Sequence, residues 1–347
     1  MNALAYEVTR GVVERDRDAV LAVWSGNLGH DERMRRKYGW FYLGSPGGPP
    51  MLGLLRLVPG GRVVGAASAG PRRMLLDGRE VRGGLLVDLA VAPSHRAFGP
   101  ALMLQGHFVE HGDERFDMLY GFPNGKAEPV FRRAGHVRLG EMVRYVRVLR
   151  HARYLARHVP AALAGAAGVL VDRARHLVLA SRVLARDALR VQWADSADPR
   201  FDDLWSDSAP RQGMCGIHDA AFARWRFDQS PLGKTRYLLL SSPGDDRLLA
   251  WFACQDGANG SLDVIDFWSV DAAHGIGRRF VDALLLAAWR AGAASVAVEY
   301  AAPPPMLAGW TGAGFVERGR RPLYGRALAG SLPADGPLHI TAADEDE

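Results

Sequence analysis

The chain has 347 residues, which is long enough for two domains of ordinary size, each with its own core. Hydrophobic residues make up 48% and charged residues 23% of the sequence, a composition typical of a soluble globular protein. No run reaches the roughly eighteen apolar residues that a membrane span needs, and residues 1–7 lack the regions of a signal peptide. We therefore expect no membrane span and a cytoplasmic location.

The formal net charge is +5, and nearly all of the basic residues are arginine. Because no basic block carries interleaved aromatic residues, nucleic acid is not an expected partner. The mild positive charge favours an anionic substrate such as CoA or a nucleotide sugar. The two cysteines, Cys215 and Cys254, have no close partner in the sequence, so we expect two buried thiols and no metal site.

The first elements in chain order are expected to be helical, followed by antiparallel strands. Apolar residues recur at helical spacing before Trp24 within residues 1–45, whereas residues 27–36 indicate a loop or a short helix. The Gly/Pro-rich residues 47–50 indicate a loop. Strands are then predicted at residues 53–58 and 62–69, and a hairpin around Asp77-Gly78 is predicted from residues 74–76 and 80–81.

A buried strand, a turn and a helix are predicted at the centre of the first half. Residues 85–91 form a nearly unbroken apolar run, which indicates a strand buried on both faces, and Pro93 ends it. Pro100 suits the first position of the following helix, because the missing N–H has no intrahelical partner there. The unpaired N–H groups of this helix N-terminus, next to Arg96, predict an anion site, most simply for a pyrophosphate.

Two motifs in this region resemble those of the GNAT acyltransferases. The first resembles their acyl-CoA-binding motif and consists of Val91-Ala92-Pro93 followed by Arg96, Gly99 and Ala101. The second follows a strand predicted at residues 116–120 and consists of Asn124, Ala127, Phe131 and Gly135. Phe131 stands where the family usually has a tyrosine, so the tyrosine general acid of many relatives is missing here.

The resemblance implies an α+β (mixed α/β) fold, in which a twisted, mostly antiparallel sheet with a splayed central strand is flanked by helices. It also implies acetyl-CoA or another acyl-CoA as co-substrate, and a bulge in the central strand near Val91. On this resemblance, Leu89 and Val91 contact the pantetheine arm. The pyrophosphate and the rest of CoA are then held by Arg96, Ala97, Gly99, Ala101 and Asn124.

An internal repeat at an offset of 185 residues predicts a second copy of the fold. Trp40, Tyr42, Ser45 and Pro46 recur as Trp225, Phe227, Ser230 and Pro231. The second copy has Ala272 in place of the motif arginine and three prolines at 303–305 in place of the region of Asn124, so only the first copy is expected to bind acyl-CoA. The predicted domains are residues 1–150, a helical linker 151–190, a degenerate second domain 191–330 and a flexible acidic tail 331–347.

Three residues are candidates for the chemistry of acyl transfer, which requires a base and the positioning of two substrates. Asp88 is the only ionisable group within residues 85–91. Burial raises the pKa of such a carboxyl toward the range of a base, but a structural role is equally expected, because Asp266 is its approximate counterpart in the second copy. Tyr120 is the candidate to replace the missing acid. Asn124 either orients CoA or a water molecule, or caps a helix.

Aromatic residues are the candidates for acceptor binding, because aromatic faces stack on sugars or bases and an arginine can pair with a phosphate. These candidates are Trp40, Tyr42, Trp225 and Arg226, with Phe227 beside them. Ordinary packing in the core is the favoured alternative for all of them.

The sequence therefore predicts an acyl-CoA-dependent N-acyltransferase of tandem-GNAT type. It would move an acetyl or other short acyl group to a primary amine, and a nucleotide-linked amino sugar is one possible acceptor. We also expect a homodimer. The alternatives are a tandem-GNAT aminoacyl transferase, whose lysine-rich helical arm is absent here, and a non-catalytic GNAT-like scaffold, suggested by Phe131. The intact Arg96, Gly99 and Ala101 argue against the scaffold.

Overall fold

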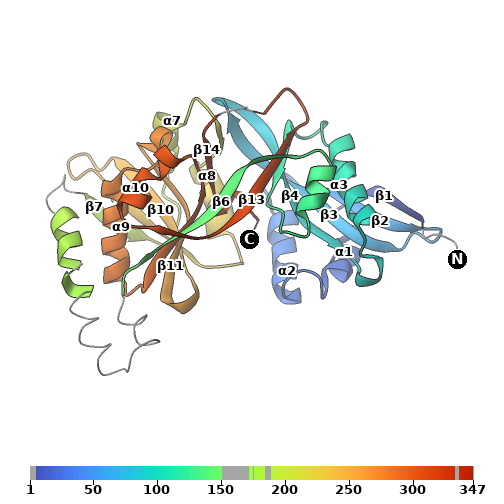
Figure 1. Cartoon of the computed structure of the whole chain (residues 1–347), viewed down its shortest axis with the longest axis horizontal. Helices are drawn as coiled ribbons and strands as arrows, with labels where there is room; N and C mark the ends of the chain where they lie inside the picture. The colour runs from blue at the N-terminus through green and yellow to red at the C-terminus, as the bar shows by residue number, and fades with distance from the viewer. Residues whose placement is uncertain (1–4, 151–171, 175, 184–188, 333–335, 347) are drawn as a thin grey trace, which may run out of the picture.

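The computed structural model describes residues 5–150, 172–174, 176–183, 189–332 and 336–346. Its strands form one 14-stranded sheet that runs through the molecule, with helices packed against it (Figure 1). Most of the linker predicted at residues 151–190 lies outside the described residues, and the described residues 172–174 and 176–183 are helical.

The first half contains six strands, β1 to β6, and four labelled α-helices. In chain order they are β1 (Ala5–Gly11), α1 (Arg17–Trp24), α2 (Asp31–Lys37), β2 (Met51–Val58), β3 (Val63–Leu76), β4 (Arg79–Val91), α3 (Phe98–His111), β5 (Met118–Gly121), α4 (Glu128–Arg133) and β6 (Val137–Val148). A π-helical turn, Tyr38–Leu43, follows α2. Strands β1 to β4 pair antiparallel in sequence order, and β4 pairs with β5 in parallel.

The helix expected at the start of the chain is wrong for residues 5–11, which form β1, the edge strand of the sheet beside β2. Tyr6 and Val8 alternate with Glu7 and Thr9, which is the period-two pattern of a strand. Tyr6 and Val8 pack against the apolar cluster that also contains side chains of α3. The helical spacing predicted for this segment begins only at Arg17.

Strands β3 and β4 form one long hairpin. The predicted turn at Asp77-Gly78 is confirmed, and both residues have a positive φ, +49° and +75°, as a tight hairpin turn requires. The segments predicted separately at 62–69 and 74–76 belong to β3, and those at 80–81 and 85–91 belong to β4. Pro71 does not end β3, because it stays in register opposite Gly84.

The second half repeats this order of elements. It contains β7 (Arg190–Ala194), α7 (Phe201–Ser208), β8 (Met214–Gly216), α8 (Ala220–Ala223), β9 (Thr235–Ser241), β10 (Leu248–Asp256), β11 (Ser261–Ser269), α9 (Arg278–Arg290), β12 (Ser295–Ala301), α10 (Ala308–Gly312), β13 (Val316–Ala327) and β14 (Leu338–Thr341). The succession from β9 to β13 matches that from β2 to β6: three antiparallel strands, a helix, a parallel strand, a helix and a final strand.

The two halves exchange their final strands. Strand β13 of the second half lies between β5 and β6, and β6 of the first half lies between β13 and β12. Figure 1 shows these two long strands running together from one half to the other. Because each half completes the sheet of the other, backbone hydrogen bonds hold the halves together as well as side-chain packing.

Aromatic packing also joins the halves. The rings of Trp40 and Trp225, which occupy equivalent places in the repeat, stack at 5.0 Å, and Trp40 Nε1 donates a hydrogen bond to the Trp225 carbonyl (2.9 Å). Both residues belong to one apolar cluster that includes residues of both halves. Both cysteines are buried free thiols, as the sequence predicted.

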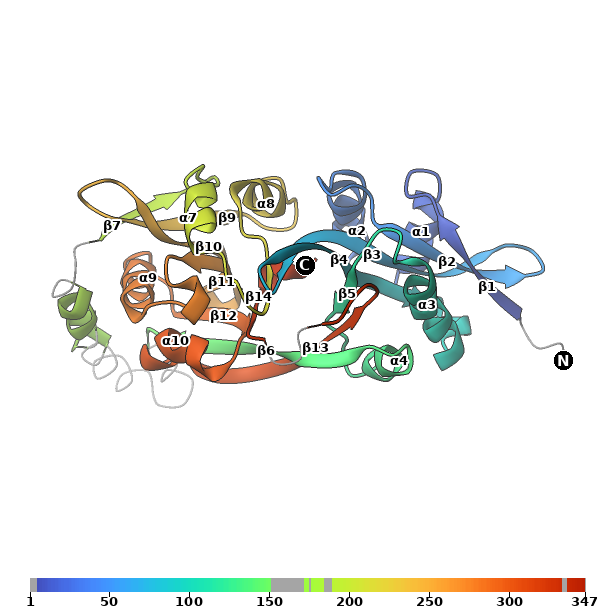
Figure 2. The ribbon, with the colours of Figure 1, turned by 90° about the horizontal axis from the view of Figure 1, so that it is seen from above.

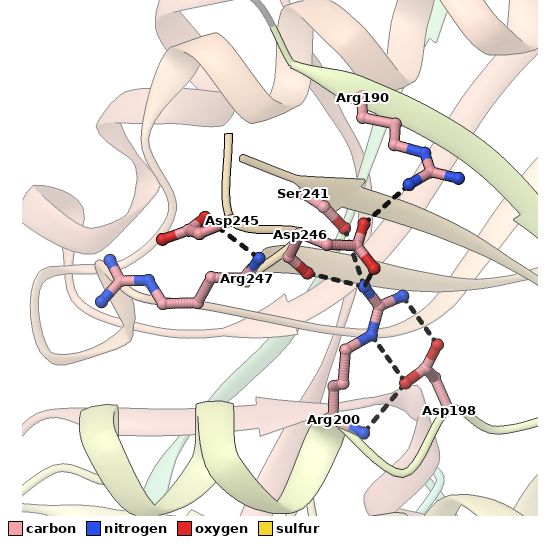
Figure 3. Close-up of polar contacts among 7 residues, drawn as sticks. All are labelled: Arg190, Asp198, Arg200, Ser241, Asp245, Asp246 and Arg247. Carbon is pink, nitrogen blue, oxygen red and sulfur yellow. Dashed lines mark hydrogen bonds and ion pairs between the residues drawn. The ribbon is translucent and has the colours of Figure 1, made fainter. Parts of the chain in front are cut away.

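A polar network fixes α7 on the sheet of the second half (Figure 3). Arg200, the residue before α7, binds both carboxylate oxygens of Asp198, and its Nη1 donates to the carboxylate of Asp246 (3.0 Å) in the turn between β9 and β10. Arg190 at the start of β7 binds the same carboxylate (2.9 Å). These contacts tie β7, α7 and the β9–β10 turn together.

Residues 338–346 differ from the flexible acidic tail predicted for 331–347. Strand β14 pairs with β12 and β8 between the two halves (Figure 2), and a capping box at Thr341 and Asp344 begins a short 3₁₀ turn. The carboxylate of Asp344 is almost fully buried. The last residues of the described chain therefore form part of the core. Within the described residues, none of the helices combines the length and apolarity of a membrane-spanning helix.

Candidate active site

The central strands of the first half splay apart and open a cavity. The parallel ladder between β4 and β5 extends only from Gly83 to Leu85 on β4, and beyond it the two strands diverge. A cavity of about 380 Å³ lies in this wedge, lined by residues 85–89 of β4 and residues 122–124 after β5. This confirms the splayed central strand that the sequence predicted.

A β-bulge at the wedge turns Asp88 out of the regular ladder. Asp88 and Leu89 together face Ala67, because the register of β3 with β4 shifts between Ala66 and Ser68. Asp88 has a φ of +55°, in the left-handed region that aspartate tolerates better than most residues. The bulge lies two to three residues before the position expected near Val91.

The carboxylate of Asp88 is held by a buried cation. Lys37 Nζ and the Tyr42 hydroxyl each donate a hydrogen bond to it at 2.8 Å, and Lys37 also forms an ion pair with Asp346. Burial raises the pKa of Asp88, and the charge of Lys37 opposes that effect. Asp88 is thus mainly a fixed negative charge at the wedge, which weakens its case as the base.

The tail brings two further carboxylates to the same cavity. Glu345 and Asp346 both line it, and Glu345 binds the guanidinium of Arg321 on β13, with one contact at 3.0 Å. Burial raises the pKa of Glu345 to about 7, although Arg321 acts to lower it. A carboxyl with this pKa exchanges protons near neutral pH, as a general base requires.

The N-terminus of α3 follows the end of β4 in the chain. The helix begins at Phe98, so Pro100 is its third residue rather than its first, a position whose N–H also lacks an intrahelical partner. No side chain of the described residues caps the helix. A Cβ added at Gly99 would meet no described atom within 4 Å, so a ligand has space to approach the free N–H groups.

Arg96 lies beside this helix start and is exposed. Its Nε donates to the Val91 carbonyl (3.2 Å), and its Nη2 contacts the side-chain oxygen of Asn27. Ala97 is the extended N-cap residue of α3, and Ala101 lies within its first turn. The residues predicted to hold a pyrophosphate are therefore neighbours here.

Asn124 and Phe131 line the cavity as the motif implies. The Asn124 side-chain oxygen accepts hydrogen bonds from the N–H groups of Lys126 (3.0 Å) and Ala127 (3.1 Å), so it caps the turn before α4. Only its amide nitrogen is left for a ligand. Phe131 is nearly fully buried against the cavity wall and offers no proton.

Tyr120 is buried, and its hydroxyl donates to the Asp344 carbonyl (3.1 Å). Burial raises its pKa, which makes it a poor acid at neutral pH. Tyr120 does not line the wedge cavity, so the structure gives no support to its predicted catalytic role.

The predicted acceptor residues lie in the core. Trp40, Trp225 and Arg226 are buried at the junction of the halves and do not line the wedge cavity, and Arg226 Nε donates to the Ala343 carbonyl (3.0 Å). Tyr42 reaches the site only through its hydrogen bond to Asp88. Core packing, the favoured alternative, describes these residues.

The equivalent region of the second half is closed. A Cβ at Gly275 would clash with the Met306 backbone, and one at Gly277 would approach the Asp271 carboxylate at 2.5 Å. Asp266, the counterpart of Asp88, is fully buried and binds His218 Nδ1 (2.8 Å) and the Thr341 hydroxyl (2.9 Å). The second half therefore lacks the space for a pyrophosphate before α9.

Sequence reasoning missed four residues of the site: Lys37, Arg321, Glu345 and Asp346. Lys37 is one of three lysines in the chain, and the acidic end at 344–347 is conspicuous. Neither signal indicates that Lys37 and Asp346, which are 309 positions apart, are in contact. Their contact depends on the path of the chain through β13 and β14, which no local pattern predicts.

Comparisons with solved structures agree on the fold. A probable N-acyltransferase from Enterococcus faecalis V583 aligns over 94% of this chain and 73% of its own, with a TM-score of 0.63 and 10% identity. A glucosamine N-acetyltransferase region of a fungal β-N-acetylglucosaminidase aligns over 94% and 38%, with a TM-score of 0.60 and 13% identity.

A tandem GNAT protein from the clavulanic acid biosynthesis pathway aligns over 94% of this chain and 100% of its own, with a TM-score of 0.52 and 14% identity. Neither a protein-family model nor the sequence of a curated protein matches the chain. The chain has the fold of the GCN5-related N-acetyltransferases in their tandem arrangement.

Proposed function

We propose that the first half binds acyl-CoA in the wedge between β4 and β5 and transfers its acyl group to a primary amine. The observation that carries this proposal is a splayed strand pair whose cavity is lined by a cluster of carboxylates, with a helix N-terminus that no described side chain caps following β4 in the chain. Each part matches one part of the reaction, namely the pyrophosphate, the pantetheine arm with its thioester, and the amine.

The wedge supplies backbone groups for the pantetheine arm. Beyond Leu85, the edge of β4 that faces β5 is no longer engaged by the β5 ladder, so an extended chain can pair with residues 86–89. Arg96 and the N–H groups at the start of α3 would hold the pyrophosphate through charge and the helix dipole. The apolar side chains of Leu86 and Phe131 would cover the acyl end.

The tail supplies the base in this proposal. The acceptor amine arrives as an ammonium ion and must lose a proton before it attacks the thioester carbonyl. Glu345 lines the cavity with a pKa of about 7, so its ionised carboxylate can take that proton. Phe131 offers no proton to the departing thiolate, which leaves unaided because a thiolate is only modestly basic.

Charge at the cavity favours a cationic acceptor. Three carboxylates, those of Asp88, Glu345 and Asp346, line it. Two cations, Lys37 and Arg321, pair with them, and Arg321 also pairs with Glu299, so carboxylates are in excess. We propose an amino sugar as the first acceptor class to test. The likeness to a glucosamine N-acetyltransferase region supports this choice. A nucleotide-linked amino sugar, a homodimer and a cytoplasmic location stay predictions from the sequence.

The proposal is tested by following the release of the CoA thiol from acetyl-CoA in the presence of glucosamine, a nucleotide-linked amino sugar, a diamine, or glucose as the amine-free control. We expect release that depends on an amine and a matching acetylated product by mass spectrometry. Glu345→Gln should remove it, and Glu317→Gln, at a half-exposed carboxylate on β13, should not.

Two negative results have different meanings. Release with a diamine but not with either sugar would reject the amino-sugar class and keep the acyl transfer. No binding of acyl-CoA by the intact chain would reject the acyl transfer itself.

A further inference from the structure

A second and larger cavity lies at the opposite end of the β4–β5 pair from the wedge. It has a volume of about 540 Å³ and is enclosed by the β3–β4 hairpin, the loop before β5 and residues 217–225 of the second half. Its apolar walls include Pro71, Val81, Phe116, Ile217 and Phe222. The cavity is therefore bounded by both halves and shares no lining residue with the wedge cavity.

Arg72 on β3 is the unusual member of this cavity wall. It is only 7% exposed, and its guanidinium lies 4.7 Å from the Trp225 ring and 5.2 Å from the Phe41 ring. Its register partner on β4 is Gly83, so no side chain opposes it across the ladder. The two rings and the glycine hold the guanidinium in place.

The charge of Arg72 has no ion-pair partner among the described residues. Its Nη1 donates to the Pro71 carbonyl (3.2 Å), whereas Nε and Nη2 are buried and have no hydrogen-bond partner of normal geometry among the described residues. The Tyr120 hydroxyl, which donates to the Asp344 carbonyl, and the carboxylates of Asp344 and Asp346 act on the guanidinium from the side of the core. A buried guanidinium with two unused donors is costly unless a ligand or water supplies acceptors.

The other charges around the cavity are mostly compensated by protein groups. Arg73 pairs with Glu80 (2.7 Å) and Asp219 (2.6 Å), and Arg82 pairs with Asp117 (2.9 Å) outside the cavity. Arg115, at the rim, donates to the Pro49 carbonyl (2.6 Å) and has no carboxylate partner among the described residues. Glu114, which also lines the cavity, pairs with Arg10 (3.6 Å), so Arg72 and Arg115 are the two cavity arginines without an ion-pair partner among the described residues.

We propose that this cavity is a second binding site, for an organic anion with an apolar body such as an aromatic carboxylate. The carboxylate would accept the two unused donors of Arg72 in the planar fork that arginine offers, and the apolar body would lie against Phe222 and Ile217. The site is separate from the acyl-CoA wedge and does not depend on the proposed transferase activity.

The test uses 2-naphthoate as the probe and 2-naphthamide as its uncharged counterpart, with binding to the full chain measured by calorimetry. We expect one naphthoate per chain, and affinity for naphthamide at least tenfold weaker. Arg72→Met should weaken naphthoate at least tenfold and leave naphthamide unchanged, because only the charged contact is lost.

A second variant keeps the test decisive if Arg72→Met does not fold. Ala221, an exposed residue on the cavity rim, can be changed to Trp to fill the entrance without altering the core, and Ala221→Ser is its matched control. Ala221→Trp should abolish naphthoate binding, and Ala221→Ser should retain it. The proposal is overturned by no binding at millimolar naphthoate, or by equal binding of naphthoate to the wild type and either Arg72→Met or Ala221→Trp.

Discussion

Replacing Lys37 by Met tests whether the buried charge cluster beneath the wedge is as the structure shows it. Lys37 Nζ lies 2.8 Å from Asp88 and also pairs with Asp346, and all three side chains are at most 15% exposed. Removing the cation leaves two buried carboxylates without their shared partner. Breaking such a buried pair costs about 3–5 kcal/mol of unfolding free energy.

The measurement is urea unfolding followed by circular dichroism. Arg36→Met on the same helix is the control, because its side chain is 56% exposed and lies 3.9 Å from Glu32, a surface pair worth about 0.5 kcal/mol or less. Adding Asp346→Asn to Lys37→Met should restore part of the loss, because it removes one of the unpaired charges.

The loss should also depend on pH. Without Lys37, the folded-state pKa values of Asp88 and Asp346 rise above their unfolded values, so the folded protein binds protons more tightly. Stability is then highest at low pH and falls as the pH rises through the folded pKa values. Lys37→Met should therefore be more destabilised at pH 8 than at pH 5. A loss no larger than that of Arg36→Met would refute this account of the cluster.

Two further predictions concern the tail. The kcat/KM for acyl transfer should rise with pH through about 7, because Glu345 must be ionised to accept a proton. Glu345→Gln should lose this rise with pH together with about a hundredfold or more of the rate. An unchanged pH profile in the variant would exclude Glu345 as the base. Burial raises the pKa of Asp344 to about 6. The folded state therefore favours its protonated form, and the unfolding free energy of the wild type should fall by up to about 3 kcal/mol between pH 4 and 6. Asp344→Asn should reduce this pH dependence. Parallel curves of unfolding free energy against pH for the two proteins would contradict the prediction.

Local pattern was enough to predict the centre of the first half. The apolar run at 85–91, the stop at Pro93 and the turn at Asp77-Gly78 are short-range signals, and each corresponds to an element of the structure. The residues of the predicted anion site lie together at the start of α3, because a helix N-terminus and its neighbours are close in sequence, and their role stays a prediction. The first turn of α3 was misplaced, because proline suits more than one position there, and the bulge lies two to three residues before the expected position.

Long-range contacts were not predictable in the same way. The exchange of β6 and β13 depends on which strand edges remain free after each half folds, and a single sequence does not encode that in any local pattern. Lys37 meets Asp346 only because of this exchange and because β14 returns between the halves. The acidic end was expected to be solvated because charged termini usually are.

The repeat gives a structural reason for the recurrence of two acceptor candidates. Trp40 and Trp225 recur because each is the partner of the other across the junction of the halves. Their recurrence in both copies is therefore accounted for by this packing. Asp266 similarly repeats the place of Asp88 in the fold, but it is paired with a histidine in place of a lysine.

The most direct test of the central claim is calorimetric titration of acetyl-CoA into the wild type, Arg96→Ala and, as a control in the second half, the exposed Arg224→Ala. The account predicts one acetyl-CoA per chain, because only the first half is open before its helix. Losing the Arg96 contact should cost about 1.5–3 kcal/mol, a ten- to hundredfold loss of affinity, and Arg224→Ala should bind as the wild type does. No binding to the wild type, or equal binding by Arg96→Ala, would contradict the account.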